Sequence, residues 1–163
     1  MATQIILLLD KSGSMYERID DTIGGLNSFV DDIKIRYPDS EFSLFHFSDK
    51  CQEIFTKKPI ADVDMFTKED YVPNGNTALY DAMGLILTTY KAGKFVIMTD
   101  GCENASTKFS KTSIKNMMKA SSLDVTYIGA DVSEAKEDFD IERSVEYVGN
   151  RTPDMFRFAS QNI

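Results

Sequence analysis

Oxygen-bearing side chains are concentrated in three short segments of this 163-residue sequence: DKSGS at residues 10–14, GNT at residues 75–77 and TDG at residues 99–101. From these segments we single out two carboxylates and three hydroxyls, which belong to Asp10, Ser12, Ser14, Thr77 and Asp100. All five are hard oxygen donors, which Mg²⁺ prefers in near-octahedral coordination while it keeps several waters. The residue types therefore predict a site for one divalent cation.

The spacing inside the first segment suits such a site. Asp10, Ser12 and Ser14 alternate along a turn, which can aim all three side chains inward, and Gly13 supplies backbone freedom between them. Two carboxylates leave the site with little negative charge to spare, so an anionic ligand could still join the cation. The plain alternative is that turns after buried strands are rich in Asp, Ser and Gly because these residues cap and turn the chain.

The three segments need elements that hold them at one place. Residues 3–9 and 94–98 are apolar runs of strand length, typical of strands buried on both faces, and each run leads directly into one of the polar segments. The remaining segment opens a predicted helix, residues 77–90, with Thr77 as its cap. In an open α/β sheet, ligands bind outside the carboxyl ends of the strands. The segments are therefore expected to converge there.

Strand and helix patterns alternate along the rest of the chain. Apolar residues at spacings of three and four predict a helix from Ile19 to Tyr37-Pro38, in which Gly24-Gly25 is explained by close packing on the sheet. Polar and apolar residues alternate along residues 41–47, as in a half-buried strand, and residues 51–56 are expected to pair back on them. Residues 62–71 are weakly patterned and are expected to form an irregular turn of helix. Later elements are a helix around Ile114, a strand at 123–128, a short helix at 133–139, a strand at 144–148 and a helix at 153–161.

This alternation predicts one α/β domain over residues 1–163, a doubly wound, mostly parallel six-stranded sheet with helices on both faces. The net charge of −8, from 26 acidic and 18 basic residues, includes no obvious basic patch, so we expect no nucleic-acid partner. The longest apolar run, residues 5–9, is far shorter than the roughly 20 residues of a membrane span. Cys51 and Cys102 are interpreted as reduced thiols. The short apolar run and the reduced thiols favour an intact cytosolic N-terminus and a cytoplasmic location without membrane association.

The site residues carry a resemblance to a known family. In their order along the chain they match the five positions of the metal-ion-dependent adhesion site of von Willebrand factor A domains, and residues 75–82 and 99–101 are also similar to that family's blocks. The resemblance covers essentially the whole chain and implies the family's Rossmann-like fold. The sequence looks like small cytosolic bacterial and phage members rather than secreted adhesion domains.

The resemblance also implies roles. Ser12 and Ser14 would coordinate the cation directly, Thr77 would do so in the ligand-competent state, and Asp10 and Asp100 would act through waters or at the edge of the shell. The cation would be Mg²⁺, with Mn²⁺ or Ca²⁺ as alternatives. An Asp or Glu of a partner protein would complete the coordination, which makes the domain a metal-dependent interaction module and not an enzyme. The family's last helix can slide, but here the helix around residues 155–159 is short, which leaves such switching open.

Three other functions compete with this interpretation. A haloacid-dehalogenase-like phosphotransferase also places an Asp after its first strand with Mg²⁺, but it needs a second Asp where this chain has Ser12. A serine hydrolase would need a base near Ser12 or Ser14. The single histidine, His46, lies on another strand and is expected to be a satisfied structural residue. The third alternative is a scaffold whose metal site is vestigial.

Other polar residues near the site are expected to serve the backbone. Asp49 suits a turn and Asp81 suits the first turn of a helix. Asn27 and Asn104 are expected to form hydrogen bonds with nearby backbone.

Overall fold

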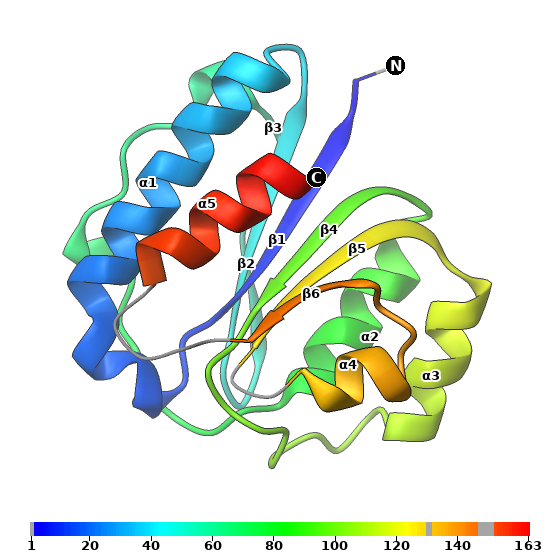
Figure 1. The fold of residues 1–163 in the computed structure, drawn as a ribbon. Helices are drawn as coiled ribbons and strands as arrows, with labels where there is room; N and C mark the ends of the chain where they lie inside the picture. The colour runs from blue at the N-terminus through cyan, green and yellow to red at the C-terminus, as the bar shows by residue number, and fades with distance from the viewer. Residues whose placement is uncertain (1, 130–131, 147–151) are drawn as a thin grey trace.

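The computed structural model describes residues 2–129, 132–146 and 152–163 (Figure 1). Its strands are β1 (Gln4–Asp10), β2 (Glu41–Phe47), β3 (Cys51–Pro59), β4 (Ala92–Met98), β5 (Ser122–Gly129) and β6 (Arg143–Glu146). Its α-helices are α1 (Ile19–Arg36), α2 (Leu79–Thr89), α3 (Lys111–Ala120), α4 (Ser133–Glu137) and α5 (Thr152–Asn162). Short 3₁₀ helices are η1 (Gly13–Arg18), η2 (Ile60–Asp62) and η3 (Lys68–Asp70).

The strands form one six-stranded sheet in the order β3-β2-β1-β4-β5-β6. All neighbouring pairs are parallel except β2 and β3, which are antiparallel. The chain passes from β1 to β2 on one side and later returns to β4 on the other side of β1, so the strand order reverses between β1 and β4. Leu9 of β1 pairs with Met98 of β4, so these two strands end side by side. The predicted doubly wound, mostly parallel sheet is confirmed.

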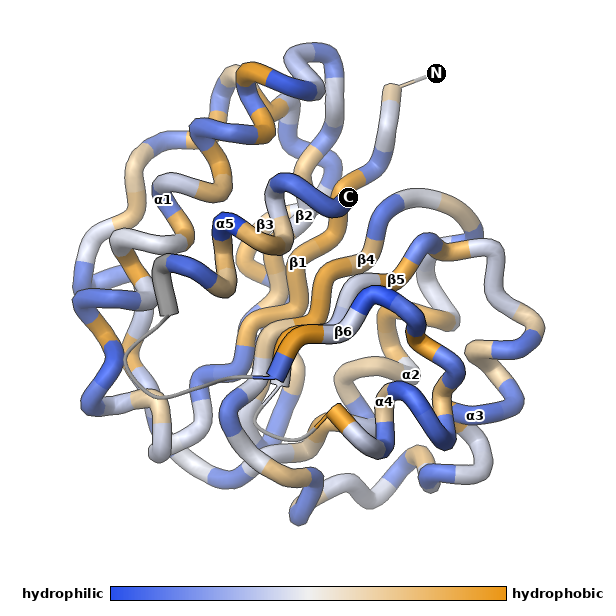
Figure 2. Tube along the Cα trace, viewed as in Figure 1, coloured by the Kyte–Doolittle hydropathy of each residue, from blue (hydrophilic) through white to orange (hydrophobic). Residues whose placement is uncertain are grey.

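Helices cover both faces of the sheet, α1 and α5 on one face and α2, α3 and α4 on the other (Figure 1). Successive side chains of β1 point to opposite faces of the sheet and therefore belong to different parts of the core. Leu7 packs in the cluster that contains Phe29 of α1, whereas Leu8 packs in the cluster that contains Met83 of α2. Figure 2 shows the hydrophobic strands running between the two helical layers. The central strand is therefore buried on both faces, as its continuous apolar run predicts.

The prediction that residues 41–47 form a half-buried strand is wrong. Residues 42–47 are all buried, including the polar Ser43 and His46. Both faces of β2 are covered, because Phe42 packs in the cluster beside α1 and Phe45 packs in the cluster beside α2. Ser43 is compatible with this burial because its hydroxyl accepts from the backbone N–H of Lys57 at 2.9 Å.

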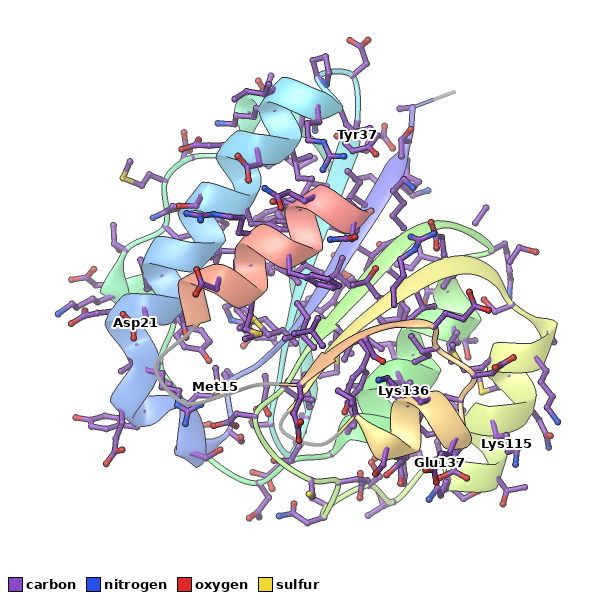
Figure 3. The ribbon with its side chains drawn as sticks, viewed as in Figure 1. Met15, Asp21, Tyr37, Lys115, Lys136 and Glu137 are labelled. Atoms are coloured by element: carbon purple, nitrogen blue, oxygen red, sulfur yellow. The ribbon has the colours of Figure 1, made fainter. Side chains whose placement is uncertain are left out.

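The explanation of Gly24-Gly25 by packing on the sheet is also wrong. A β-carbon on Gly25 would lie 2.3 Å from the Phe156 ring, whereas a β-carbon on Gly24 would meet nothing within 4 Å. Gly25 thus makes room for a ring of α5, and Gly24 faces open space. The carboxyl ends of α1 and α5 also meet, because the Tyr37 hydroxyl donates to the backbone oxygen of Ile163 at 2.6 Å (Figure 3).

Several predicted boundaries shift. The strand expected at residues 51–56 continues to Pro59. The irregular helical turn expected within residues 62–71 is present as the 3₁₀ helix η3. The strand expected at 144–148 is β6, which begins at Arg143; residues 147 and 148 lie outside the described residues. Within the part of the chain that the structure describes, no helix is both long enough and apolar enough to cross a membrane.

Candidate functional site

The three polar segments predicted from the sequence meet at the carboxyl edge of the sheet. The segment at residues 10–14 leaves β1, and the segment at 99–101 leaves the neighbouring strand β4. The segment at 75–77 leads into α2 and is joined to the first by a hydrogen bond from the Gly13 N–H to the Gly75 backbone oxygen at 3.0 Å. The site therefore lies where the strand order reverses, the usual position for ligands in open α/β sheets.

Asp10 is the buried anchor of the site. Its side chain is fully enclosed, and its carboxylate accepts from the Ser12 backbone N–H and from the Thr99 hydroxyl, each at 2.6 Å. Burial raises the pKa of Asp10 above its ordinary value, although both hydrogen bonds oppose that shift. Tyr71 adds a further contact, since its hydroxyl donates to the Asp10 backbone oxygen. The anchor is thus held by its own turn, by the end of β4 and by the loop before α2.

A chain of hydrogen bonds joins the two serines to the second carboxylate. The Ser12 and Ser14 hydroxyl oxygens lie 3.1 Å apart, and the Ser14 hydroxyl donates to Oδ1 of Asp100 at 2.7 Å. Ser12 is buried and Ser14 is exposed, so the chain leads from the core toward solvent. Met15, the next residue of η1, is fully buried in the core cluster on the α1 side, which secures this turn (Figure 3).

Thr77 lies against the loop that follows β4. It is buried, and a β-carbon on Gly101 would lie 3.2 Å from its hydroxyl oxygen and 4.0 Å from Oδ2 of Asp10. Its backbone is fixed in both directions by Asn104, because Thr77 N–H donates to the Asn104 side chain and Asn104 N–H donates to the Thr77 oxygen, both at 2.9 Å. All five predicted residues are therefore brought to one place.

The prediction that Thr77 caps α2 is wrong. The helix begins at Leu79 after Ala78, and no side chain of the preceding residue caps it. Its first-turn N–H groups are taken up by the loop after β4, since Asp81 N–H donates to the Ser106 hydroxyl at 2.9 Å. The Thr77 hydroxyl is consequently not used as a helix cap.

Polar residues around the site serve the backbone, but over longer distances along the chain than predicted. Asp49 accepts from the Asn76 backbone N–H at 3.2 Å. Asp81 lies in the first turn of α2, as predicted, and accepts from the backbone N–H groups of residues 107, 108 and 109 at 2.9 Å each. Asn27 binds both backbone groups of Phe66, at 3.0 and 2.7 Å. None of these partners is adjacent in sequence, so proximity along the chain was a poor guide.

His46 is a core residue, as predicted, but it is not fully satisfied. Its ring meets that of Tyr71 edge-on at 5.4 Å between centroids, and within the described residues its Nε2 has no hydrogen-bond partner. Burial, with a smaller contribution from Lys11, lowers the pKa of His46 to about 4. An imidazole with a pKa lowered in this way is a weak base, which argues against His46 as the base of a serine hydrolase.

Sequence reasoning missed two residues that bear on the site, Thr99 and Arg18. Thr99 is fully buried and donates to Asp10, and Arg18 Nη1 lies 3.9 Å from Oδ2 of Asp100. A threonine at the end of a buried strand, directly before an acidic residue, could have suggested the first role. Arg18 follows the first segment by only four residues, but the turn of η1 that directs it toward Asp100 is visible only in the fold.

The donor set fits a hard divalent cation. Hydroxyl and carboxylate oxygens gather at one edge, with neither histidine nor thiolate among them. Among the described residues, no group of three or more His, Cys, Asp and Glu side chains could hold a metal, so softer or more highly charged sites are not offered there. A cation here would depend on hydroxyls and on groups from outside the chain.

No protein-family model matches the sequence, and no curated protein matches it either. Solved structures do match. A von Willebrand factor type A protein from Catenulispora acidiphila is 15% identical with a TM-score of 0.69, over 98% of this chain and 42% of that one. The ArnB paralog VWA2 from Sulfolobus acidocaldarius is 16% identical with a TM-score of 0.69, over 99% and 45%.

A third match is proximal thread matrix protein 1 from the mussel byssus, 18% identical with a TM-score of 0.68, over 98% of this chain and 45% of that one. The chain thus spans less than half the length of these three proteins. At such identities the likeness concerns the fold. The sheet order, the two helical layers and these neighbours establish that the chain has the Rossmann-like fold of von Willebrand factor A domains.

Proposed function

We propose that this domain is a protein-interaction module that binds one divalent cation, Mg²⁺ or alternatively Mn²⁺ or Ca²⁺, at the carboxyl edge of its sheet. The observation that carries the proposal is the chain of oxygens from Ser12 through Ser14 to Asp100, beside the buried Asp10. The Ser12, Ser14 and Thr77 hydroxyls would hold the cation, and Asp10 and Asp100 would balance its charge. The von Willebrand factor A fold supports a role in protein interaction rather than catalysis.

The partner, on this proposal, supplies an Asp or Glu to the cation. Two carboxylates, one of them already facing Arg18, leave a divalent cation under-neutralised. Ser14 is exposed while Asp10 and Ser12 are buried, so the open side of the site faces solvent at Ser14. A carboxylate that enters such a partly dry site is attracted more strongly by a divalent charge than it would be in water.

Calorimetric titration of metal-free protein with Mg²⁺ tests the metal site. Wild type should bind one ion per chain, and Ser12→Ala/Ser14→Ala and Asp10→Ala should bind it far more weakly. The matched control is Ser110→Ala/Ser113→Ala, because those hydroxyl oxygens also lie 2.9 Å apart but at the start of α3. Equal binding by all of these proteins would contradict the proposal.

Two further assays test the interaction and the absence of turnover. Partners captured from the native host should be lost with chelator and with Ser12→Ala/Ser14→Ala, and recovery in every arm would place the interaction surface elsewhere.

A phosphatase and esterase screen should show no activity. A metal-dependent rate abolished by Asp10→Asn would instead support the phosphotransferase alternative.

A further inference from the structure

Arg18 places a positive charge at the candidate metal site. It is the last residue of η1, the 3₁₀ helix that begins inside the first polar segment. Its Nη1 lies 3.9 Å from Oδ2 of Asp100, while Oδ1 of the same carboxylate accepts the Ser14 hydroxyl at 2.7 Å. Both oxygens of Asp100 therefore face a positive or hydrogen-bonding group of the chain itself.

Asp100 is not the acidic residue closest to Arg18 along the chain. Asp20, only two residues on, is engaged by Lys68 at 2.9 Å in an ion pair with both side chains exposed. The guanidinium of Arg18 lies instead toward Asp100, whose side chain is only 5% exposed. A carboxylate removed from water in this way is stabilised by a nearby opposite charge. Arg18 supplies that charge from within the chain.

We infer that Arg18 is a resident counter-cation of the site: it balances Asp100 when no metal is bound, and it weakens the binding of a divalent cation. The inference rests on the proposed metal site. A divalent ion and a guanidinium are attracted to the same carboxylate and repel each other. A separation of about 6 Å in a water-like dielectric makes this repulsion worth about a tenfold change in affinity.

The test compares Mg²⁺ affinity and metal-free stability in four proteins: wild type, Arg18→Gln, Arg18→Lys and Arg143→Gln. Arg143 is the matched control, because it too pairs with a carboxylate, Asp124, at 2.8 Å, and its pairing with Thr126 places it away from the carboxyl end of β5. Arg143→Gln changes the net charge as Arg18→Gln does. Arg18→Lys keeps the positive charge.

Arg18→Gln should bind Mg²⁺ about tenfold more tightly than wild type, and the difference should shrink at high salt because the arginine is partly exposed. Its metal-free form should have a lower Tm than wild type. Arg18→Lys should remain close to wild type in both measurements, and Arg143→Gln should keep the wild-type affinity.

Unchanged or weaker Mg²⁺ binding by Arg18→Gln would overturn the inference while leaving the metal site in place. An equal gain in Arg143→Gln would overturn it as well, because the effect would then be one of overall charge. Failure of all four proteins to bind Mg²⁺ would overturn both the inference and the proposed function.

Discussion

Thr99 and Asp10 show how a single buried hydroxyl can hold a site together. The Thr99 hydroxyl donates to Oδ2 of Asp10 at 2.6 Å in a region where both residues are fully buried. A carboxylate without water depends on such donors, because its unmet hydrogen-bonding capacity is costly. The order of the site therefore depends on a residue that would not itself be a metal ligand.

Replacement of Thr99 by valine should lower the free energy of unfolding by about 1–3 kcal/mol, since it leaves a buried acceptor unmet without creating a large cavity. Thr126→Val is the control: Thr126 is equally buried, and its hydroxyl has no hydrogen-bond partner among the described residues. That variant should be neutral or more stable. Urea unfolding measures both, and equal losses in the two variants would contradict the assigned role of Thr99.

The lowered pKa of His46 predicts that the free energy of unfolding depends on pH. Its folded pKa of about 4 lies below the ordinary value of 6.5, so the unfolded chain binds the extra proton between these values. The stabilisation is complete above the unfolded pKa and is lost as pH falls toward the folded pKa, by at most about 3 kcal/mol. The raised pKa of Asp10 acts in the opposite direction, because its folded form retains a proton as pH rises above the ordinary value.

The His46 contribution is isolated by urea unfolding of wild type and His46→Phe at a series of pH values across that window. The two stabilities should diverge as pH falls, with wild type losing more. Parallel profiles would show that the imidazole of His46 is not held neutral by the fold.

At the scale of elements, α1 and α5 are joined by a glycine that admits an aromatic ring. Gly25 faces Phe156, and Gly24 is exposed with open space beside it. Gly25→Ala should destabilise the domain by about 1–3 kcal/mol because the new methyl group overlaps a buried ring. Gly24→Ala should stabilise it by up to about 1 kcal/mol through helix propensity. Thermal unfolding checks the pair, and a stabilised Gly25→Ala would refute this packing.

The sequence predicted the bounds of some helices and strands better than others. The α1 pattern, with its apolar spacing and a proline just beyond its end, predicted Ile19–Arg36 closely because these signals are local. The start of α2 was misjudged because its N–H groups bind Ser106, a residue 25 positions away. The burial of β2 was also misjudged, since a strand pattern does not show which helices will cover each face.

At the scale of the whole molecule, the alternation of strands and helices predicted the fold class, and the polar segments after β1 and β4 predicted where they would meet. The sequence did not show the contacts that hold the site in shape. Thr99 donates to Asp10 from 89 positions away, and Arg18 reaches Asp100 across a comparable separation. Such partners become evident only when the topology brings distant loops to one edge.

Paramagnetic Mn²⁺ can show whether a cation binds at the carboxyl edge of the sheet. In an amide NMR spectrum of the isotope-labelled domain, small additions of Mn²⁺ should first broaden the signals of Ser12, Ser14 and Gly101. Signals of Gly93 and Ser122, which lie at the amino ends of β4 and β5 and thus away from the site, should stay sharp. The variant Ser12→Ala/Ser14→Ala should lose the selective broadening. Selective broadening of other residues, or none in wild type, would show that the cation does not bind at this edge of the sheet.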